Sequence, residues 1–333
     1  SGRWLLMRAS YDVREPIDTP GHYGALELWD RSTGRSMVVR RYEEDAFPDG
    51  QLSADGRYAA ICDADGTHVW DRRTGGWLTI DRGDCESVDI SADGRFVAWS
   101  TTMSYWGPSS DLKVWDRTTG LATLLDRVTT LQWRTSAAIS GDGSTVAWAH
   151  SDWNGDGGGT NGVVRVLDRG SGDEVARLTD HPAECDGVDL SGDGGAMSFS
   201  CLDNVWWWDR SSGQLDEAPR FGDFFASFSP SLSGDGATVV FDNFQGQPQT
   251  LLPGRRSEPK ARSDDAGLGD HPGLLPWYHD GYLMLWHPRT GELEAVAGPD
   301  VWYQRTAISA DGRFLAFTAF TGGEQADVLI ARR

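Results

Sequence analysis

Two short motifs recur along the whole chain, and their repetition constrains the fold more than any other feature of the sequence. The first is Ser-x-Asp-Gly, whose aspartates are Asp55, Asp93, Asp142, Asp193, Asp235 and Asp311. The second is Trp-Asp-Arg-x-x-Gly, which recurs around Trp29, Trp70, Trp115, Trp208 and Trp286, with a variant at Leu167. Motifs repeated at such spacing indicate an array of similar supersecondary units.

Each unit reads as four short strands. Asp-Gly between alternating apolar runs is typical of a tight hairpin, because glycine accepts the positive φ that such turns need. Five residues after that glycine, the second strand carries a large apolar side chain, in the order Ile61, Trp99, Trp148, Phe199, Phe241 and Phe317. We expect this column to pack between units. Four-strand units repeated six or seven times predict a β-propeller.

The repeat count predicts one all-β domain over residues 1–333, a seven-bladed β-propeller. A six-bladed propeller is the alternative, if the two ends merge into one composite blade. The first unit starts at its second strand and the last stops after its third. We therefore expect that the chain was excised from a longer one, and that it belongs to a multidomain protein or a complex. Residues 244–281 form a polar, Pro/Gly-rich insertion in the loop between the second and third strands of the sixth unit.

The net charge excludes two classes of partner. The formal charge is −20 over 333 residues. Nucleic acid and anionic lipid surfaces are both bound through clustered Lys and Arg, so neither is expected as a partner. No apolar run approaches the ~20 residues needed to span a bilayer, so we expect no membrane insertion.

The four cysteines favour two local disulfides. In the hairpin around Asp193, Leu190 is expected to face Ala196, and continuing outward places Cys185 opposite Cys201, within disulfide range. Cys62 ends one strand and Cys85 begins the first strand of the next unit, on the same face. The alternative is four free buried thiols. Two disulfides predict a secreted or cell-surface protein.

The repeated run Ser91 to Trp99, followed by Val114 to Gly120, resembles the PD40 repeats of TolB-like (WD40-like) propellers. Secreted arrays of the actinobacterial type are similar in particular. True WD40 repeats differ, because they carry a Gly-His pair that is absent here. The resemblance implies a propeller that contacts proteins or carbohydrates, or that serves as a scaffold for an attached catalytic domain. No catalytic residue of the family maps onto this sequence.

The loops between the second and third strands vary most in length, and in a propeller they emerge on the same face as the loops that join units. We call this the loop face. Loops placed by a rigid scaffold commonly carry function. Aromatic side chains with neighbouring arginines crowd these loops and suit protein anchors or sugar stacking. The candidate binding residues are Tyr105, Trp106, Trp133, Arg134, Trp153, Trp277, Tyr278, Trp302, Tyr303 and Arg305.

One loop resembles the first half of a calcium site. Asp152, Asn154 and Asp156 stand at alternate positions before a glycine, as the ligands of a calcium loop do. Val163 occupies the twelfth position, where an EF-hand has a bidentate Glu, so Ca²⁺ would need further ligands such as Thr160 or Asn161. The alternative is a loop rich in Gly and Asp with turn chemistry only.

The sequence thus favours a secreted, non-catalytic binding or scaffold propeller that recognises a protein or glycan partner through the loop face. The alternative is a carbohydrate-active lyase or hydrolase whose active site lies at the mouth of the channel. Its candidate residues are His22, His68, His150, His181, His271 and His279, with Asp186, Asp280 and Glu86 as partners. None of them forms a spacing diagnostic of a catalytic triad, and no Gly-x-Ser-x-Gly or His-Glu-x-x-His motif is present.

Overall fold

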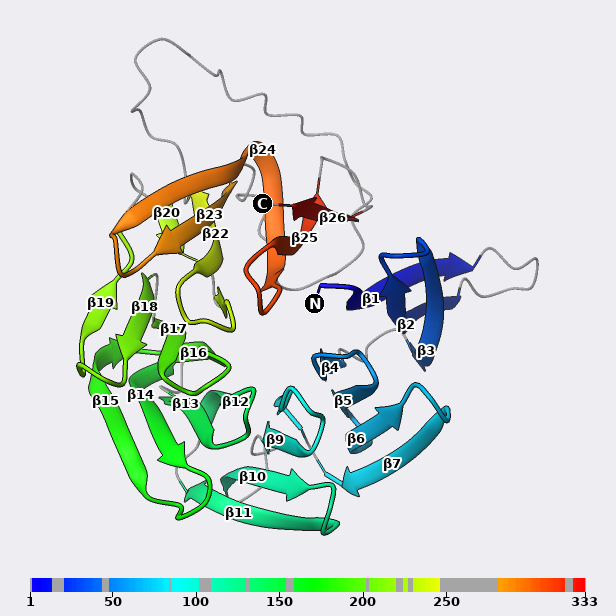
Figure 1. Ribbon diagram of the computed structural model, residues 1–333, viewed down its shortest axis with the longest axis horizontal. Coiled ribbons are helices and arrows are strands. Elements are labelled where there is room, and N and C mark those ends of the chain that lie inside the picture. Colours follow the sequence, from blue (N-terminus) through cyan, green and yellow to red (C-terminus); the bar gives the residue numbers. More distant parts are fainter. Residues whose placement is uncertain are drawn as a thin grey trace.

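Antiparallel sheets of three, four and seven strands form a ring around a central axis in the computed structural model (Figure 1). The structure describes residues 2–13, 21–43, 48–83, 85–101, 109–129, 132–153, 159–201, 204–219, 224–226, 230–245, 281–320 and 326–332. Every helix or strand assigned within these ranges is a β-strand. The prediction of an all-β propeller is therefore confirmed. No helix in the described ranges is long and apolar enough to cross a membrane.

The first three blades follow one another around the ring. Blade 1 has three strands, β1 (Trp4–Val13), β2 (Gly21–Asp30) and β3 (Arg35–Glu43). Blade 2 has four, β4 (Asp49–Leu52), β5 (Tyr58–Asp63), β6 (Gly66–Asp71) and β7 (Gly76–Asp81). Blade 3 has β8 (Ser87–Ile90), β9 (Phe96–Ser100), β10 (Ser110–Asp116) and β11 (Leu121–Val128).

The remaining strands complete the ring in three further sheets. Blade 4 has β12 (Gln132–Ile139), β13 (Thr145–Trp153), β14 (Gly159–Asp168) and β15 (Glu174–Ala183). Blade 5 has β16 (Cys185–Leu190), β17 (Ala196–Cys201), β18 (Asn204–Asp209) and β19 (Leu215–Glu217). Blade 6 has β20 (Phe224–Ala226), β21 (Ser231–Leu232), β22 (Val239–Gln245), β23 (Gly281–His287), β24 (Glu292–Ile308), β25 (Phe314–Phe320) and β26 (Ala326–Arg332).

The expectation of seven blades is wrong, because hydrogen bonds divide the described strands into six sheets. The cause is β24, whose 17 residues run without interruption through the boundary between the last two repeats. Its first half pairs with β23 and its second half with β25, so those repeats share one seven-stranded sheet. The six-bladed alternative gives the right count, although the two chain ends do not merge: β1 and β26 belong to different sheets. The expected insertion at 244–281 falls mostly on residues outside the described ranges.

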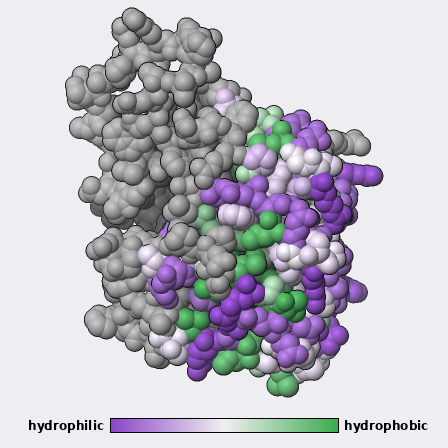
Figure 2. All heavy atoms as spheres, turned by 90° about the vertical axis from the view of Figure 1, so that its left-hand side faces the viewer, coloured by the Kyte–Doolittle hydropathy of each residue, from purple (hydrophilic) through white to green (hydrophobic). Residues whose placement is uncertain are grey.

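Inner and outer strands differ sharply in burial. All residues of β5, β9 and β17 are buried, whereas β7 and β11 are largely exposed. The predicted column of large side chains on the second strands lies between neighbouring blades and is 0–7% exposed, namely Ile61, Trp99, Trp148, Phe199, Phe241 and Phe317. The outermost strands carry the exposed apolar side chains, and Figure 2 shows apolar and polar groups interleaved on one side of the molecule.

The Ser-x-Asp-Gly motif is a turn that closes on itself. Ser91 Oγ donates to Asp93 Oδ1 at 2.7 Å and accepts from the Phe96 backbone N at 3.0 Å. Asp93 Oδ1 also accepts from the Arg95 backbone N at 2.8 Å, and Gly94 adopts a positive φ of 67°. The serine–aspartate bond recurs at Ser53, Ser140, Ser191, Ser233 and Ser309. The aspartates of this motif are therefore turn residues, as predicted.

Consecutive turns are bonded blade to blade through their backbones. Ala92 N donates to Gly141 O at 2.8 Å, and Asp142 N donates to Gly192 O at 2.8 Å. The same link joins Ala54 to Ala92, Gly192 to Gly234 and Gly234 to Ala310. These bonds make a belt of turns around the inner ring of the propeller.

In blades 1 to 4 the arginine of the second motif, or of its Leu167 variant, ties the blade to its own turn and to the neighbouring blade. Asp116 accepts two hydrogen bonds from Arg95, at 3.1 and 2.8 Å. Arg117 Nε donates to Gly94 O at 2.9 Å, and its guanidinium carbon lies 4.4 Å from the ring centroid of Tyr58. Equivalent stacks are Arg31 on Phe314, Arg72 on Trp4 and Arg169 on Phe96. The Arg31–Phe314 stack joins blade 1 to blade 6, so the same repeated contact closes the ring.

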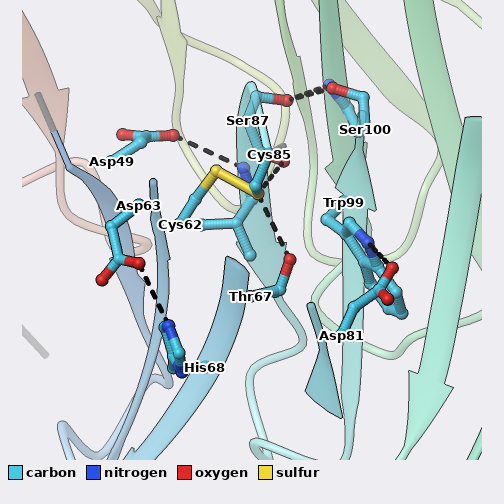
Figure 3. The surroundings of a disulfide bond; sticks show 12 residues. Asp49, Cys62, Asp63, Thr67, His68, Asp81, Cys85, Ser87, Trp99 and Ser100 are labelled. Atoms are coloured by element: carbon cyan, nitrogen blue, oxygen red, sulfur yellow. Dashed lines mark hydrogen bonds and ion pairs between the residues drawn. A yellow bond between two sulfur atoms is a disulfide. The ribbon is translucent and has the colours of Figure 1, made fainter. Parts of the chain in front are cut away.

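Both predicted disulfides are present, and all four cysteines are paired. Cys62–Cys85 links the end of β5 to the start of blade 3 (Figure 3). Cys185–Cys201 joins directly opposed residues of β16 and β17. The predicted register between them is wrong, because Leu190 faces Met197 rather than Ala196.

A β-bulge explains why the cysteines still meet. The register shifts between Asp186 and Asp189, where two residues of β16 oppose one residue of β17, and Gly187 adopts a positive φ of 57°. A glycine in this conformation suits the extra residue of a bulge.

Candidate binding sites

The register of blade 4 places four strand ends at one edge of the sheet. Gln132 pairs with Asp152, Asp152 with Thr160, and Thr160 with Ala183. Trp133 and Arg134 lie at this end of β12, and Trp153 is the last residue of β13. The edge is opposite the Ser-x-Asp-Gly turn, which joins the other ends of β12 and β13.

Blade 6 repeats this arrangement. Trp302 pairs with Phe320, and Gly281 pairs with both Val301 and Phe244. Trp302, Tyr303 and Arg305 thus lie on β24 where it passes from one repeat to the next. The backbone therefore places six of the ten predicted binding residues on the loop face, three at or near strand ends in blade 4 and three in the middle of β24. The other four, Tyr105, Trp106, Trp277 and Tyr278, lie outside the described residues.

The predicted calcium loop is only partly described. Asp152 lies on β13, and its Oδ2 accepts a hydrogen bond from Asn161 Nδ2 at 3.3 Å. Asn161 has a positive φ of 52°, a conformation that asparagine tolerates better than most residues. Asn154 and Asp156 lie outside the described residues. Within the described ranges, no group of three His, Cys, Asp or Glu side chains could hold a metal ion, and calcium stays a prediction.

A cavity of about 580 Å³ lies between blades 1 and 2. Blade 1 contributes side chains of β3, and blade 2 contributes side chains of β6, β7 and the loops that follow β5 and β7. The lining residues are Val39, Arg40, Asp65, His68, Trp77, Thr79 and Arg82. This volume falls within the roughly 300–1,000 Å³ typical of sites for small ligands.

A chain of hydrogen bonds fixes one wall of the cavity. His68 is 5% exposed and lies between two partners, with Nε2 3.1 Å from Asp63 Oδ1 and Nδ1 3.0 Å from Thr79 Oγ1. Figure 3 shows the contact between His68 and Asp63 on blade 2. His68 and Thr79 are directly opposed residues of β6 and β7, so their side chains share one face of the sheet. The chain leads from a buried carboxylate to an exposed hydroxyl.

Arg40 joins this chain to blade 1. Its Nη1 lies 2.9 Å from Asp63 Oδ2, and its Nη2 lies 2.9 Å from Asp65 Oδ2. The buried Tyr42 ring lies beside the same guanidinium group, and burial together with the charge of Asp63 raises the pKa of Tyr42 well above its usual value. Both ions of the Arg40–Asp63 pair are partly or fully shielded from water, so the pair is weakly screened by salt.

Among these residues the sequence predicts only His68 as a candidate, at the mouth of the channel. The structure places it instead between the outer strands of blade 2. No sequence motif predicts Asp63, Thr79 or Trp77 as site residues. The hairpin between β6 and β7 offered a signal, because it pairs Trp70 with Trp77 and therefore His68 with Thr79.

His150 is a poor candidate for an acid–base group. It is buried on β13 with its ring centroid 4.9 Å from that of Trp148, and burial lowers its pKa to about 4. The imidazole is therefore neutral at physiological pH.

Two carboxylates on innermost strands hold neighbouring blades together. Asp89 Oδ2 accepts from the Ile139 backbone N at 2.8 Å, and Asp189 Oδ2 accepts from the Leu232 backbone N at 2.7 Å. Burial, with a smaller contribution from the charge of Asp189, raises the pKa of Asp89 to about 8. Burial also raises the pKa of Asp189 to about 6. Each aspartate accepts a hydrogen bond from a backbone amide of the next blade. Its role is therefore structural.

The fold has solved counterparts. A TolB protein from Agrobacterium tumefaciens superposes with a TM-score of 0.53 at 19% sequence identity, over 93% of this chain and 98% of that chain. A chain of a mitotic checkpoint complex gives 0.60 at 12% identity, over 98% and 94%. Hydrazine synthase from Kuenenia stuttgartiensis gives 0.58 at 17% identity, over 94% and 92%. These similarities show a TolB-like propeller fold.

Sequence comparison adds no family. No family model matches the chain, and no curated protein matches it significantly.

Proposed function

We propose that this chain is a non-catalytic binding and scaffold propeller that recognises a protein partner through its loop face. The observation that carries the proposal is the strand register. It brings the ends of β12 and β13, with Trp133 and Trp153, and the middle of β24, with Trp302, to the edges of their sheets from which the variable loops emerge.

The opposite face offers little room for recognition. Its turns repeat the same Ser-x-Asp-Gly geometry in six copies. Their backbone N–H and C=O groups are used in hydrogen bonds between neighbouring blades. A surface that is identical in every blade serves packing, whereas loops of differing length can be shaped to one partner. Aromatic residues and arginine supply much of the energy at protein interfaces.

The similar solved structures support the proposal that this propeller binds a protein. One of the similar chains belongs to a mitotic checkpoint complex, so propellers of this shape do occur within assemblies. The two disulfides support an extracytoplasmic location, because disulfides persist in oxidising compartments. Calcium at the Asp152 loop is part of the proposal, as a stabiliser of that face. Calorimetric titration with Ca²⁺ of the protein and of Asp152→Ala tests it.

A capture experiment tests the function. The protein is immobilised and exposed to the extracellular fraction of its source, and retained partners are identified and their Kd measured by surface plasmon resonance. Trp133→Ala combined with Trp302→Ala is expected to weaken binding about 100-fold, as the loss of two aromatic anchors does. The matched control is Leu121→Ala, whose side chain is 68% exposed on the outer strand β11. Equal affinity of the double variant and the control would contradict the proposal.

A further inference from the structure

The cavity between blades 1 and 2 contains none of the ten predicted binding residues and combines features of a small-ligand site. We name it the β3–β7 pocket, after the outermost strands of the two blades that line it. Its residues are not part of the repeat. The position two residues before the motif tryptophan holds His68 in blade 2 but Lys113 in blade 3 and Trp206 in blade 5. This chemistry therefore occurs once in the ring, which scaffold packing alone does not require.

The pocket presents an aromatic ring to solvent. Trp77 is 40% exposed although indole is largely apolar, and it stands among the pocket residues. His68 meets it edge to face with ring centroids 6.3 Å apart, and Trp70 lies 6.4 Å away. These contacts fix the ring before any ligand binds. A rigid, half-exposed indole suits stacking against an apolar ring face.

Hydrogen-bonding groups of both kinds surround this ring. Asp65 is a carboxylate acceptor whose side chain is 78% exposed at the rim. Arg82 is a donor that forms no ion pair with any residue in the described part of the chain, and Thr79 carries a hydroxyl that can donate or accept. The His68–Asp63 chain holds that hydroxyl in place, so little entropy is lost when a ligand binds.

The charges decide between ligand classes. Two guanidinium groups, Arg40 and Arg82, stand against two carboxylates, Asp65 at the rim and the buried Asp63 that Arg40 contacts, so these four ions carry no net charge. An anionic ligand would also meet the repulsion of a protein whose formal net charge is −20. A cation would find both strong acceptors already paired with Arg40. A neutral ring that carries several hydroxyl groups needs hydrogen-bond donors, hydrogen-bond acceptors and an apolar surface together. The pocket supplies all three.

We infer that the β3–β7 pocket binds a neutral pyranose, either a free sugar or the terminal unit of a glycan. The C–H face of the sugar ring packs on Trp77. Its hydroxyls bond to Thr79, Asp65 and Arg82.

Saturation-transfer NMR on the intact chain tests this inference. The probes are the methyl pyranosides of glucose, galactose and mannose, each at millimolar concentration, with glucuronate and glucosamine as charged comparators. At least one neutral pyranoside is expected to receive saturation from the protein, with its C–H protons closest, and more strongly than either charged sugar.

Two variants and one control assign the signal to the pocket. Trp77→Ala is expected to weaken binding about tenfold or more, through loss of the stacking surface. Thr79→Val removes one hydroxyl and is expected to weaken it several-fold. Leu78→Ala is the control, because this neighbouring residue of β7 is 50% exposed yet does not line the pocket, and its affinity should equal that of the wild type.

Three results would overturn the inference: no saturation of any neutral pyranoside, binding that survives Trp77→Ala in a folded variant, or a stronger signal from a charged sugar. Thermal melts of each variant establish that it is folded. The outcome is independent of the loop-face proposal, because none of the residues varied here belongs to that face.

Discussion

The inner and outer strands of this propeller obey different rules. Around the inner ring, turns bond to turns and aspartates such as Asp89 cap the edge amides of the next blade. At the outside, β7 and β11 are mostly exposed and pair with a single neighbouring strand. We infer that the hydrogen bonds between inner turns and inner strands are what hold neighbouring blades together. The outer strands can therefore change from blade to blade and present a site such as the β3–β7 pocket without loss of the fold.

The largest expected effect comes from adding one methyl group to an inner turn. Gly94 has a φ of +67°, and a Cβ there would lie 2.4 Å from a ring carbon of Tyr58 in the preceding blade. Gly94→Ala combines the left-handed backbone cost with overpacking, and should lower the free energy of unfolding by about 3 kcal/mol. Urea unfolding followed by tryptophan fluorescence measures it.

The matched control is a glycine of an outer turn. Gly120 has nearly the same φ, +71°, but nothing lies within 4 Å of the position a Cβ would take. Gly120→Ala should therefore cost only the backbone term, about 1 kcal/mol. Equal losses at the two glycines would show that packing of the turn against Tyr58 contributes nothing.

A smaller effect, dependent on pH, is expected at Asp89. Because its folded-state pKa is about 8 and the ordinary value of an aspartate is about 3.9, the folded chain keeps this proton while the unfolded chain releases it. The stability that the proton contributes is complete below pH 4 and is lost as the pH rises to 8. Asp189 and Asp49 are the carboxylates that repel the ionised form.

Asp89→Asn removes this titration. The unfolding free energy of the variant relative to wild type is therefore expected to improve between pH 5 and about pH 6.5, by about 2 kcal/mol. Denaturant titrations at the two pH values measure the difference, in which the other carboxylates largely cancel. A difference that stays flat with pH would show that the Asp89 carboxyl is ionised in the folded chain throughout this range.

The features that repeat from unit to unit could be predicted from the sequence. The turn aspartates and the packing column recur in six units, so each copy supports the same interpretation. Repetition also points to a reason for arginine in the Trp-Asp-Arg motif. Arg117 both donates through Nε and stacks on Tyr58, a pairing of roles that lysine does not offer.

Features that occur only once in the structure could not be predicted from the repeats. The bulge at Gly187 adds one residue to β16, and no local pattern required it. The continuity of β24 across two repeats depends on a strand that does not stop where the repeat does. The β3–β7 pocket needs Arg40 of one blade beside Asp63 of the next, a tertiary contact that spacing within one repeat cannot express.

Native-state hydrogen exchange can show whether the inner turns hold the ring together. The amides of Ala92, Asp142 and Gly192, which bond turn to turn, are expected to exchange only through global unfolding. The bonded amides of β7 and β11 should open locally, at a free energy at least about 2 kcal/mol lower. If the inner-turn amides exchange as fast as those of β7, the inner turns do not hold the ring together.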